Sequence, residues 1–151
     1  MPNYSNGKIY RIVDNTTTQQ YFGSTTIGLS QRLAGHISKY KSWKKGNYRF
    51  VTSFKIIRNG DYTIVLVEEV PCENKQQLHK RERFHIENNE CVNKVIPLRT
   101  NDEYYLHNHH IINGKFDCLC GGRYVLKNKA RHLKYKIHLD YLCLEQSHKN
   151  K

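Results

Sequence analysis

The chain opens with alternating apolar and polar residues, the two-residue rhythm of a β-strand with one buried face. This rhythm runs over residues 7–14 and stops at Asp14-Asn15, a typical turn sequence. Residues 18–23 then resume an extended pattern. The first part of the chain therefore predicts a β-hairpin.

A helical spacing follows the hairpin. Leu29, Leu33 and Ile37 recur every four residues, which places them along one stripe of a helix. Ser30 is a suitable N-cap, because its hydroxyl can accept a hydrogen bond from a backbone N–H group of the first turn. We therefore predict a helix from Ser30 to about residue 40.

Three further elements are predicted in the middle of the chain. A short helix is expected over residues 50–58. Residues 62–70 form a nearly continuous apolar run, typical of a central strand buried on both faces, and Pro71 ends it. Residues 74–88 are expected to be helical, with Asn74 as the cap. This order of elements predicts an α/β (α+β) fold, a small and mostly antiparallel three-stranded sheet flanked by helices.

Charge is distributed unevenly along the chain. The formal net charge is +12, and residues 31–60 contain eight Lys or Arg but no Asp or Glu. Residues 114–151 hold nine Lys or Arg against three acidic residues, whereas residues 61–113 are net negative. Two basic blocks of this kind indicate a polyanionic partner, first of all DNA. A membrane surface fits poorly, because the blocks lack a long amphipathic apolar face.

The composition indicates a soluble intracellular protein. No apolar run reaches the roughly 18 residues that a membrane-spanning helix needs, and the N-terminus lacks the apolar core of a secretion signal. The five cysteines are an odd number, which argues against a disulfide framework. We expect a protein of the cytoplasm or nucleus, acting as a monomer or weak dimer and away from membranes.

Two tyrosines lie on the strands of the predicted hairpin, and an arginine and a histidine follow on the next helix. Arg32 and His36 are four residues apart, so they project from one face of that helix. A phenol, an imidazole and a guanidinium beside a carboxylate can together hydrolyse a phosphodiester. The set consists of Tyr10 in Lys8-Ile9-Tyr10, Tyr21 in Tyr21-Phe22-Gly23, Arg32 and His36.

With Glu82 on the last of these predicted helices and Asn93 after it, the set resembles the GIY-YIG nuclease domain over about residues 7–96. That family carries G-I-Y on one strand, Y-I-G on the next, an Arg and then a His or Tyr on the first helix, and a later Glu and Asn. Lys8 stands in place of the first glycine of the motif, and Phe22 in place of its second isoleucine. The resemblance implies hydrolysis of DNA with a single metal ion.

The resemblance also implies a role for each residue of the set. Alone, each would be a packing residue or a solvated charge, and only their order along the chain indicates a site. Mg²⁺, or Mn²⁺ in its place, suits a site with one carboxylate, because Mg²⁺ keeps several waters and takes few protein ligands. The implied roles are general base for Tyr10, hydrogen-bond acceptor assisting that base for His36, phosphate binding for Arg32, positioning of phosphate or water for Tyr21, metal binding for Glu82 and ordering of the site for Asn93.

A basic and aromatic segment follows within and after the first predicted helix. Its cations can neutralise backbone phosphates, and its tryptophan can stack on a base or pack against a sugar. The other explanation is a partly buried tryptophan among solvated lysines. The residues predicted to contact DNA here are Lys39, Lys41, Trp43, Lys44, Lys45 and Arg49.

Two cysteines and two histidines near the C-terminus are spaced like metal ligands. One residue separates Cys118 from Cys120, and five separate His132 from His138. Two thiolates and two imidazoles suit tetrahedral Zn²⁺, so we predict a small ββα zinc finger with both histidines on its helix and Zn²⁺ as a structural ion. The alternative is two buried thiols and two surface histidines. The basic residues predicted to contact DNA from this finger are Lys127, Lys129, Arg131 and Lys134.

We therefore predict a GIY-YIG-like nuclease domain in residues 1–97, a linker in residues 98–113 with at most a short helical turn, and a zinc finger with a C-terminal helix in residues 114–145. The predicted function is metal-dependent cleavage of DNA, aided by the finger and without a small-molecule cofactor. Two alternatives stay open: a catalytically inactive nucleic-acid-binding protein, and a protein-interaction module built on the finger.

Overall fold

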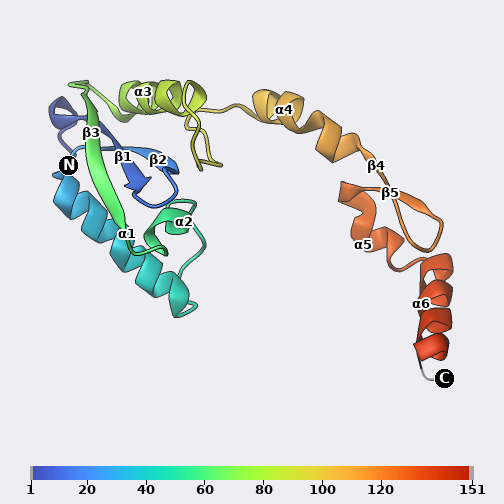
Figure 1. The fold of residues 1–151 in the computed structure, drawn as a ribbon. Coiled ribbons are helices and arrows are strands. Elements are labelled where there is room, and N and C mark those ends of the chain that lie inside the picture. Colours follow the sequence, from blue (N-terminus) through green and yellow to red (C-terminus); the bar gives the residue numbers. More distant parts are fainter. Residues whose placement is uncertain (1, 150–151) are drawn as a thin grey trace. The chain divides into compact units, whose positions relative to one another are not determined.

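The computed structural model describes residues 2–149, and describes side chains as far as residue 143. The chain folds into two compact units, Met1–Leu98 and Arg99–Lys151, each with a sheet of its own (Figure 1). No helix among the described residues is long and apolar enough to cross a membrane.

The first unit is built around a three-stranded antiparallel sheet with the strand order β2-β1-β3. The hairpin of β1 and β2 forms as predicted, and Tyr10 is paired with Gly23 in it. The predicted small antiparallel sheet flanked by helices is confirmed (Figure 1). The elements that make up the sheet and its N-terminal lead are a 3-10 turn (Tyr4–Asn6), β1 (Lys8–Asp14), β2 (Gln20–Thr25) and β3 (Tyr62–Glu69).

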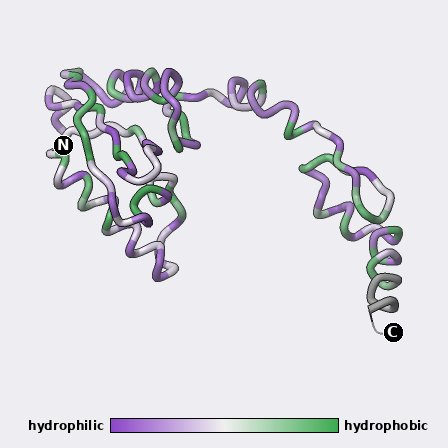
Figure 2. The backbone as a smooth tube through the Cα atoms, viewed as in Figure 1, coloured by the Kyte–Doolittle hydropathy of each residue, from purple (hydrophilic) through white to green (hydrophobic). Residues whose placement is uncertain are grey.

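The position of β3 differs from the prediction. Its apolar run, visible in Figure 2, predicts a central strand, but β3 lies at the edge of the sheet and β1 is central. Val65, Leu66 and Val67 are 36–42% exposed. The register of β1 against β3 shifts between Ile9 and Tyr10. This bulge skips Val67 and interrupts the alternation of the two faces at that residue.

Three helices accompany the sheet, α1 (Leu29–Lys44), α2 (Phe54–Ile57) and α3 (Lys75–Glu87). α3 begins as predicted, because the Asn74 side chain accepts a hydrogen bond from the Gln77 N–H group at 3.1 Å. The start of α1 differs, since its N-cap is Gly28 without a side-chain cap, and Ser30 lies inside the first turn. α1 also continues beyond its predicted end, and α2 is shorter than predicted.

Two hydrophobic clusters lie on opposite faces of the sheet. In the first, Ile9 of β1 packs with Leu78 and Ile86 of α3. The second contains Tyr10 of β1 and, from α1, Leu33. Neighbouring residues of β1 thus belong to different clusters, as the alternation of a strand requires. Tyr10 therefore faces α1, the helix that carries the arginine and histidine of the predicted set.

The second unit contains α4 (Asn101–Asn113), β4 (Lys115–Asp117), β5 (Arg123–Val125), a 3-10 turn (Leu126–Asn128), α5 (Lys129–His132) and α6 (Lys136–Lys149). α4 replaces most of the predicted linker. Thr100 Oγ1 accepts from the Glu103 N–H group at 3.1 Å, and Glu103 Oε2 accepts from the Thr100 N–H group at 2.9 Å. These two reciprocal hydrogen bonds form a capping box, which fixes the start of the helix. The polar sequence has no regular apolar spacing that would have predicted this helix.

The predicted ββα arrangement is found only in part. β4 and β5 form an antiparallel hairpin, with Cys118 and Cys120 in its turn. His132 ends α5, however, and His138 lies in α6, so the prediction that both histidines share one helix is wrong. The Tyr135 N–H group bonds to the His132 carbonyl at 3.0 Å. This tightened turn separates the two helices.

Candidate active site and metal centre

Tyr10 lies in the central strand beside Gly23 of β2. A Cβ atom added to Gly23 would lie 2.5 Å from Tyr10 Oη and 2.6 Å from Tyr10 Cζ. Only a residue without a side chain leaves room for the phenol ring at this position. The glycine that ends the Tyr21-Phe22-Gly23 motif therefore has a steric function, because it lets the tyrosine of the first strand lie across the second.

Hydrogen bonds connect three residues of the predicted set. Arg32 Nε donates to Tyr10 Oη at 2.8 Å, and Tyr10 Oη lies 2.7 Å from His36 Nε2. The other ring nitrogen, His36 Nδ1, lies 3.0 Å from Ser53 Oγ. Arg32 and His36 reach the tyrosine from the same face of α1, as their spacing predicts. The result is a continuous chain of four side chains, here called the Arg–Tyr–His–Ser chain.

His36 is held in its neutral form. Burial lowers its pKa to about 4, and the positive charges of Arg32 and Lys39 act in the same direction. A neutral imidazole has one N–H group and one lone pair. Because Arg32 already donates to Tyr10 Oη, the phenol hydrogen is directed to His36 Nε2, and Nδ1–H donates to Ser53. In this tautomer His36 accepts a hydrogen bond from the Tyr10 hydroxyl, and with a pKa of about 4 it is too weak a base to take the phenol proton itself.

Both tyrosines of the set have raised pKa values. Burial raises the pKa of Tyr10, and the Arg32 guanidinium opposes this effect. Burial also raises the pKa of Tyr21, whose ring meets the His36 ring edge-on with centroids 5.7 Å apart. The negative charge of Glu82 adds to the rise in both phenols. The Glu82 carboxylate is therefore within electrostatic range of both.

Glu82 reaches the site from α3. Ser24 of β2 donates a hydrogen bond from Oγ to Glu82 Oε2 at 2.5 Å. Burial raises the pKa of Glu82, and the Ser24 hydrogen bond opposes the rise. A partly buried carboxylate with one oxygen held in place offers its other oxygen to a divalent cation. Bound there, a cation would also offset the cost of the buried negative charge.

Asn93 acts on the backbone of β2. Its Oδ1 accepts from the Phe22 N–H group and its Nδ2 donates to the Phe22 carbonyl, both at 2.9 Å. The Val92 N–H group bonds to the Gln20 carbonyl at 2.9 Å. The segment after α3 is thereby attached to the outer edge of β2. Asn93 is thus placed to order the strand that carries Tyr21.

The sequence analysis missed two serines of the site. Ser24 contacts Glu82, and Ser53 contacts His36. Ser24 directly follows the Tyr-Phe-Gly motif, so strand alternation places it on the face of Phe22 and α3. That signal was available in the sequence. Ser53 has no local signal, because its contact with His36 depends on how α2 packs beside α1.

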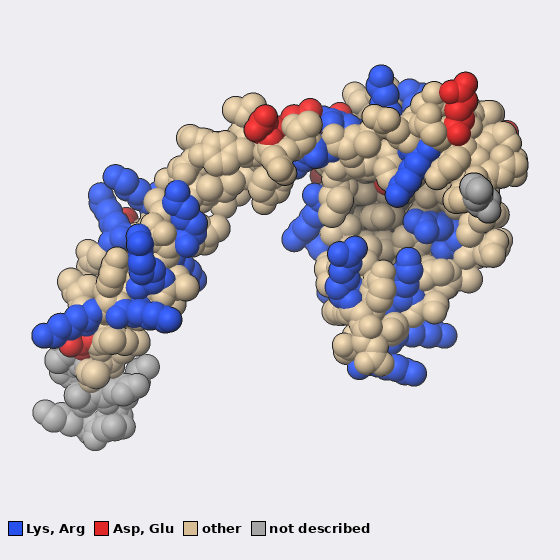
Figure 3. Space-filling model, turned by 180° about the vertical axis from the view of Figure 1, so that it is seen from behind, with Lys and Arg blue, Asp and Glu red and all other residues tan. Residues whose placement is uncertain are grey.

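The basic segment covers the end of α1 and the residues beyond it. Figure 3 shows Lys and Arg side chains spread over one face of the first unit, with Asp and Glu mainly along the edge where α3 lies. Trp43 is half-buried, and its ring centroid lies 5.4–5.8 Å from those of Tyr40, Phe50 and Phe54. Aromatic packing accounts for Trp43 better than base stacking does. The predicted cations of this segment are all exposed: Lys39, Lys41, Lys44, Lys45 and Arg49.

The four cysteine and histidine ligands predicted near the C-terminus do meet, with their ligand atoms all within 4.8 Å of one another. Cys118 Sγ lies 3.4 Å from His138 Nδ1, and Cys120 Sγ lies 3.5 Å from His132 Nε2. Zinc bonds of about 2.3 Å to sulfur and 2.0–2.1 Å to nitrogen, at a tetrahedral angle, separate the two ligand atoms by about 3.5 Å. The cluster therefore has the donor set and the size of a tetrahedral metal site that could hold zinc.

The turn that carries the two cysteines needs glycine. Gly121 has a φ of +80°, a conformation that residues with side chains rarely adopt. The Cys118 N–H group bonds to the Gly122 carbonyl at 2.8 Å and closes the turn. Among the second-unit residues whose side chains are described, only His132 and His138 are buried. The candidate metal ligands thus take the place of an apolar core.

No family model and no curated protein matches the chain. Two solved structures are similar to it. The catalytic domain of the homing endonuclease I-TevI is 20% identical with a TM-score of 0.45, and the match covers 59% of this chain and 98% of that one. A mutant of the catalytic domain of the intron endonuclease I-TevI is 22% identical with a TM-score of 0.42, covering 54% of this chain and 80% of that one.

Proposed function

We propose that the first unit is a metal-dependent DNA endonuclease of the GIY-YIG type, and that the second unit is a zinc-stabilised module that helps to hold the DNA. The observation that carries this proposal is the Arg–Tyr–His–Ser chain with the carboxylate of Glu82 in electrostatic range. In this arrangement a cation that can bind phosphate, a phenol, a neutral imidazole and a carboxylate lie near one another. These are groups that phosphodiester hydrolysis requires.

The chain supplies a route for the proton of the attacking water. Arg32 stabilises the negative charge on Tyr10 Oη when the phenol loses its proton to solvent, and His36 Nε2 keeps the phenol oxygen in place through a hydrogen bond. This help is needed, because burial raises the pKa of Tyr10 and makes the phenolate scarce near neutral pH. Tyr10 Oη can then accept a proton from water as the general base. Tyr21, beside His36, positions the phosphate or the water.

Arg32 and Glu82 have separate roles toward the phosphate. An arginine has five N–H donors, so Arg32 can bind Tyr10 through Nε and a phosphate oxygen through its terminal groups. Glu82 would hold one Mg²⁺ or Mn²⁺, with its carboxylate oriented by Ser24. A divalent cation bound there supplies charge neutralisation at the phosphate and a more acidic bound water.

The second unit contributes to DNA binding through its charge and its fold. Cys118, Cys120, His132 and His138 would hold a structural Zn²⁺ that keeps this small unit folded. A second DNA contact on the same chain raises the effective concentration of substrate at the first. The exposed cations proposed to neutralise phosphates are Lys39, Lys41, Lys44, Lys45, Arg49, Lys127, Lys129, Arg131 and Lys134.

Cleavage of supercoiled plasmid and of branched DNA tests the proposal. With Mg²⁺ or Mn²⁺ present, we expect cleavage by the wild type and a loss of at least about 100-fold in Glu82→Ala and Tyr10→Phe, because each removes a group that acts on the reacting atoms. Glu87→Ala is the matched control. Glu87 is an exposed carboxylate of the same helix in a surface ion pair with Arg83, so its loss should leave cleavage unchanged.

A nucleic-acid-binding protein without turnover is the second candidate. The full burial of Tyr10 favours it, because a general base must reach water. Tight DNA binding without a cut on any substrate, unaffected by Glu82→Ala or Tyr10→Phe, would identify such a protein. The steepness of the salt dependence separates both candidates from a protein-interaction module, since phosphate neutralisation makes DNA binding fall sharply with salt.

A further inference from the structure

α3 carries a histidine one turn before the carboxylate of the candidate site. His79 and Glu82 are three residues apart, so they are neighbours on the surface of the helix. The side chain of a helical residue lies over the turn N-terminal to it, and for Glu82 that turn contains His79. Both residues are half-buried. An imidazole and a carboxylate therefore lie on adjacent turns of one helix.

The electrostatic environment of Glu82 supports this proximity. Burial raises the pKa of Glu82, and after the Ser24 hydrogen bond the largest opposing effect is the positive charge of His79. The effect of His79 on this pKa is larger than that of Arg32, which belongs to the Arg–Tyr–His–Ser chain. His79 thus acts on the carboxylate more strongly than the arginine of the candidate site does.

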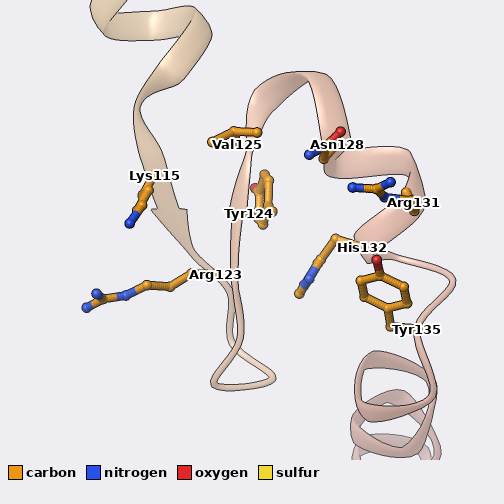
Figure 4. A pocket seen from close by; sticks show the side chains of 8 residues that line it. All are labelled: Lys115, Arg123, Tyr124, Val125, Asn128, Arg131, His132 and Tyr135. Atoms are coloured by element: carbon orange, nitrogen blue, oxygen red, sulfur yellow. The ribbon is translucent and has the colours of Figure 1, made fainter.

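The imidazole of His79 is available to a ligand. Neither ring nitrogen makes a hydrogen bond within the described part of the chain, and that part has no fully buried side-chain nitrogen without a partner, so solvent reaches both. In Figure 4, by contrast, the His132 side chain points from α5 toward the hairpin that carries its cysteine partner. The other buried or half-buried histidines with described side chains are engaged too, His36 by Tyr10 and Ser53, His85 by Glu68, and His138 by Cys118.

We propose that a ring nitrogen of His79 is a second protein ligand of the divalent cation that Glu82 would hold. The proposal rests on the proposed function, in which Glu82 binds that cation. Ser24 engages Oε2 of Glu82, which leaves Oε1 for the cation. The cation would then have one oxygen and one nitrogen ligand from α3, and water or the phosphate would fill its remaining positions.

A nitrogen ligand changes which cation the site prefers. Mg²⁺ takes oxygen ligands and keeps several waters. Imidazole suits first-row transition metals, and the affinity of such a site rises from Mn²⁺ through Co²⁺ to Ni²⁺. We therefore expect His79 to strengthen the binding of Mn²⁺ and Co²⁺ more than that of Mg²⁺.

An ion pair is the other explanation for the proximity of His79 and Glu82, and it predicts the opposite effect of a substitution. A protonated His79 would compete with the cation for the carboxylate, so His79→Ala would tighten cation binding. If His79 is a ligand, His79→Ala weakens it. Loss of a group that only supports a metal ligand already costs about 10- to 100-fold in affinity, so we expect a loss of at least about 10-fold.

Mn²⁺ binding to the full zinc-loaded chain, measured by electron paramagnetic resonance without DNA, tests this difference. Glu82→Ala identifies the Mn²⁺ that belongs to the site. In wild-type protein labelled with ¹⁵N only in its histidines, pulsed spectra of that Mn²⁺ should show a ¹⁵N coupling. His79→Asn keeps a neutral side chain with an oxygen ligand. It should still bind Mn²⁺, which shows that the site is folded, but it should lose the coupling and part of the preference for Mn²⁺ over Mg²⁺.

The possible outcomes separate this proposal from the proposed function. Mn²⁺ binding that depends on Glu82 but shows no histidine coupling, or that tightens in His79→Ala, would overturn the role of His79 and leave the nuclease standing. Absence of any Mn²⁺ binding that depends on Glu82 would overturn both the role of His79 and the cation site of the proposed function. A coupling that is lost in His79→Asn, in a chain that cuts no DNA, would support the ligand and show that the endonuclease function is wrong.

Discussion

His36 makes the folded state sensitive to acid. Its pKa falls to about 4 in the folded protein from an ordinary value of 6.5, because burial disfavours the charged ring. Between these values the unfolded chain binds more protons than the folded one. The stabilisation from neutral His36 is therefore complete above about pH 6.5 and is lost as the pH falls to about 4. We expect a loss of at most about 3 kcal/mol in the free energy of unfolding.

Denaturant unfolding near neutral pH and near pH 4 measures this loss. His36→Gln is the matched variant, because a glutamine can accept from Tyr10 and donate to Ser53 without titrating. Its stability should fall less over the same range. An equal fall in the variant and the wild type would show that other groups carry the acid sensitivity.

The contacts within the candidate site could be predicted from the sequence only in part. The spacing of Arg32 and His36 was enough to place both on one helix face, and both contact or approach Tyr10. The partner of His36 on its other nitrogen could not be predicted, because Ser53 lies in the turn before α2, a separate element. Asn93 was predicted to order the site, but its pairing with the Phe22 backbone depends on the path of the chain after α3.

Helices and strands were predicted best where the sequence carries a local signal, either a regular apolar spacing or a capping residue. The hairpin and the start of α3 were predicted correctly, since alternation and a capping asparagine are local signals. The edge position of β3 was not, because a continuous apolar run is typical of a central strand, whereas Val65, Leu66 and Val67 remain partly exposed on an edge strand. α4 was missed for a different reason. Its residues are mostly polar, and its start depends on the capping box of Thr100 and Glu103.

The capping box should control the stability of the first turn of α4. Thr100→Ala removes the acceptor of the Glu103 N–H group, and we expect the helix start to lose about 1 kcal/mol. Hydrogen exchange at the amides of Thr100 and Glu103 should then become about fivefold faster. Thr100→Ser keeps the hydroxyl and should exchange like the wild type. Unchanged exchange in Thr100→Ala would mean that the cap does not hold the turn.

The two units differ in what holds them together. The first has apolar clusters on both faces of its sheet. In the second, the buried residues among those with described side chains are the two histidines of the candidate metal centre. A unit of this size without an apolar core needs a metal or another crosslink to fold.

Removal of zinc should therefore unfold one unit and spare the other. With a zinc-selective chelator we expect loss of helical circular dichroism from the second unit. The fluorescence of Trp43, the single tryptophan of the chain, should stay unchanged because it lies in the aromatic cluster of the first unit. Cys118→Ser should reproduce the effect without chelator. Unchanged circular dichroism in both experiments would contradict a structural metal.

The pairing of Asn93 with the Phe22 backbone also bears on how copies of this protein behave in concentrated solution. An open strand edge is a template on which another chain can add a strand and begin to aggregate. Here the carboxamide of Asn93 occupies the N–H and carbonyl groups of Phe22, and Val92 occupies the carbonyl of Gln20. Part of the outer edge of β2 is thereby closed to a foreign strand. Asn93, which is placed to order the strand of Tyr21, thus also protects this edge of the sheet from pairing with another copy.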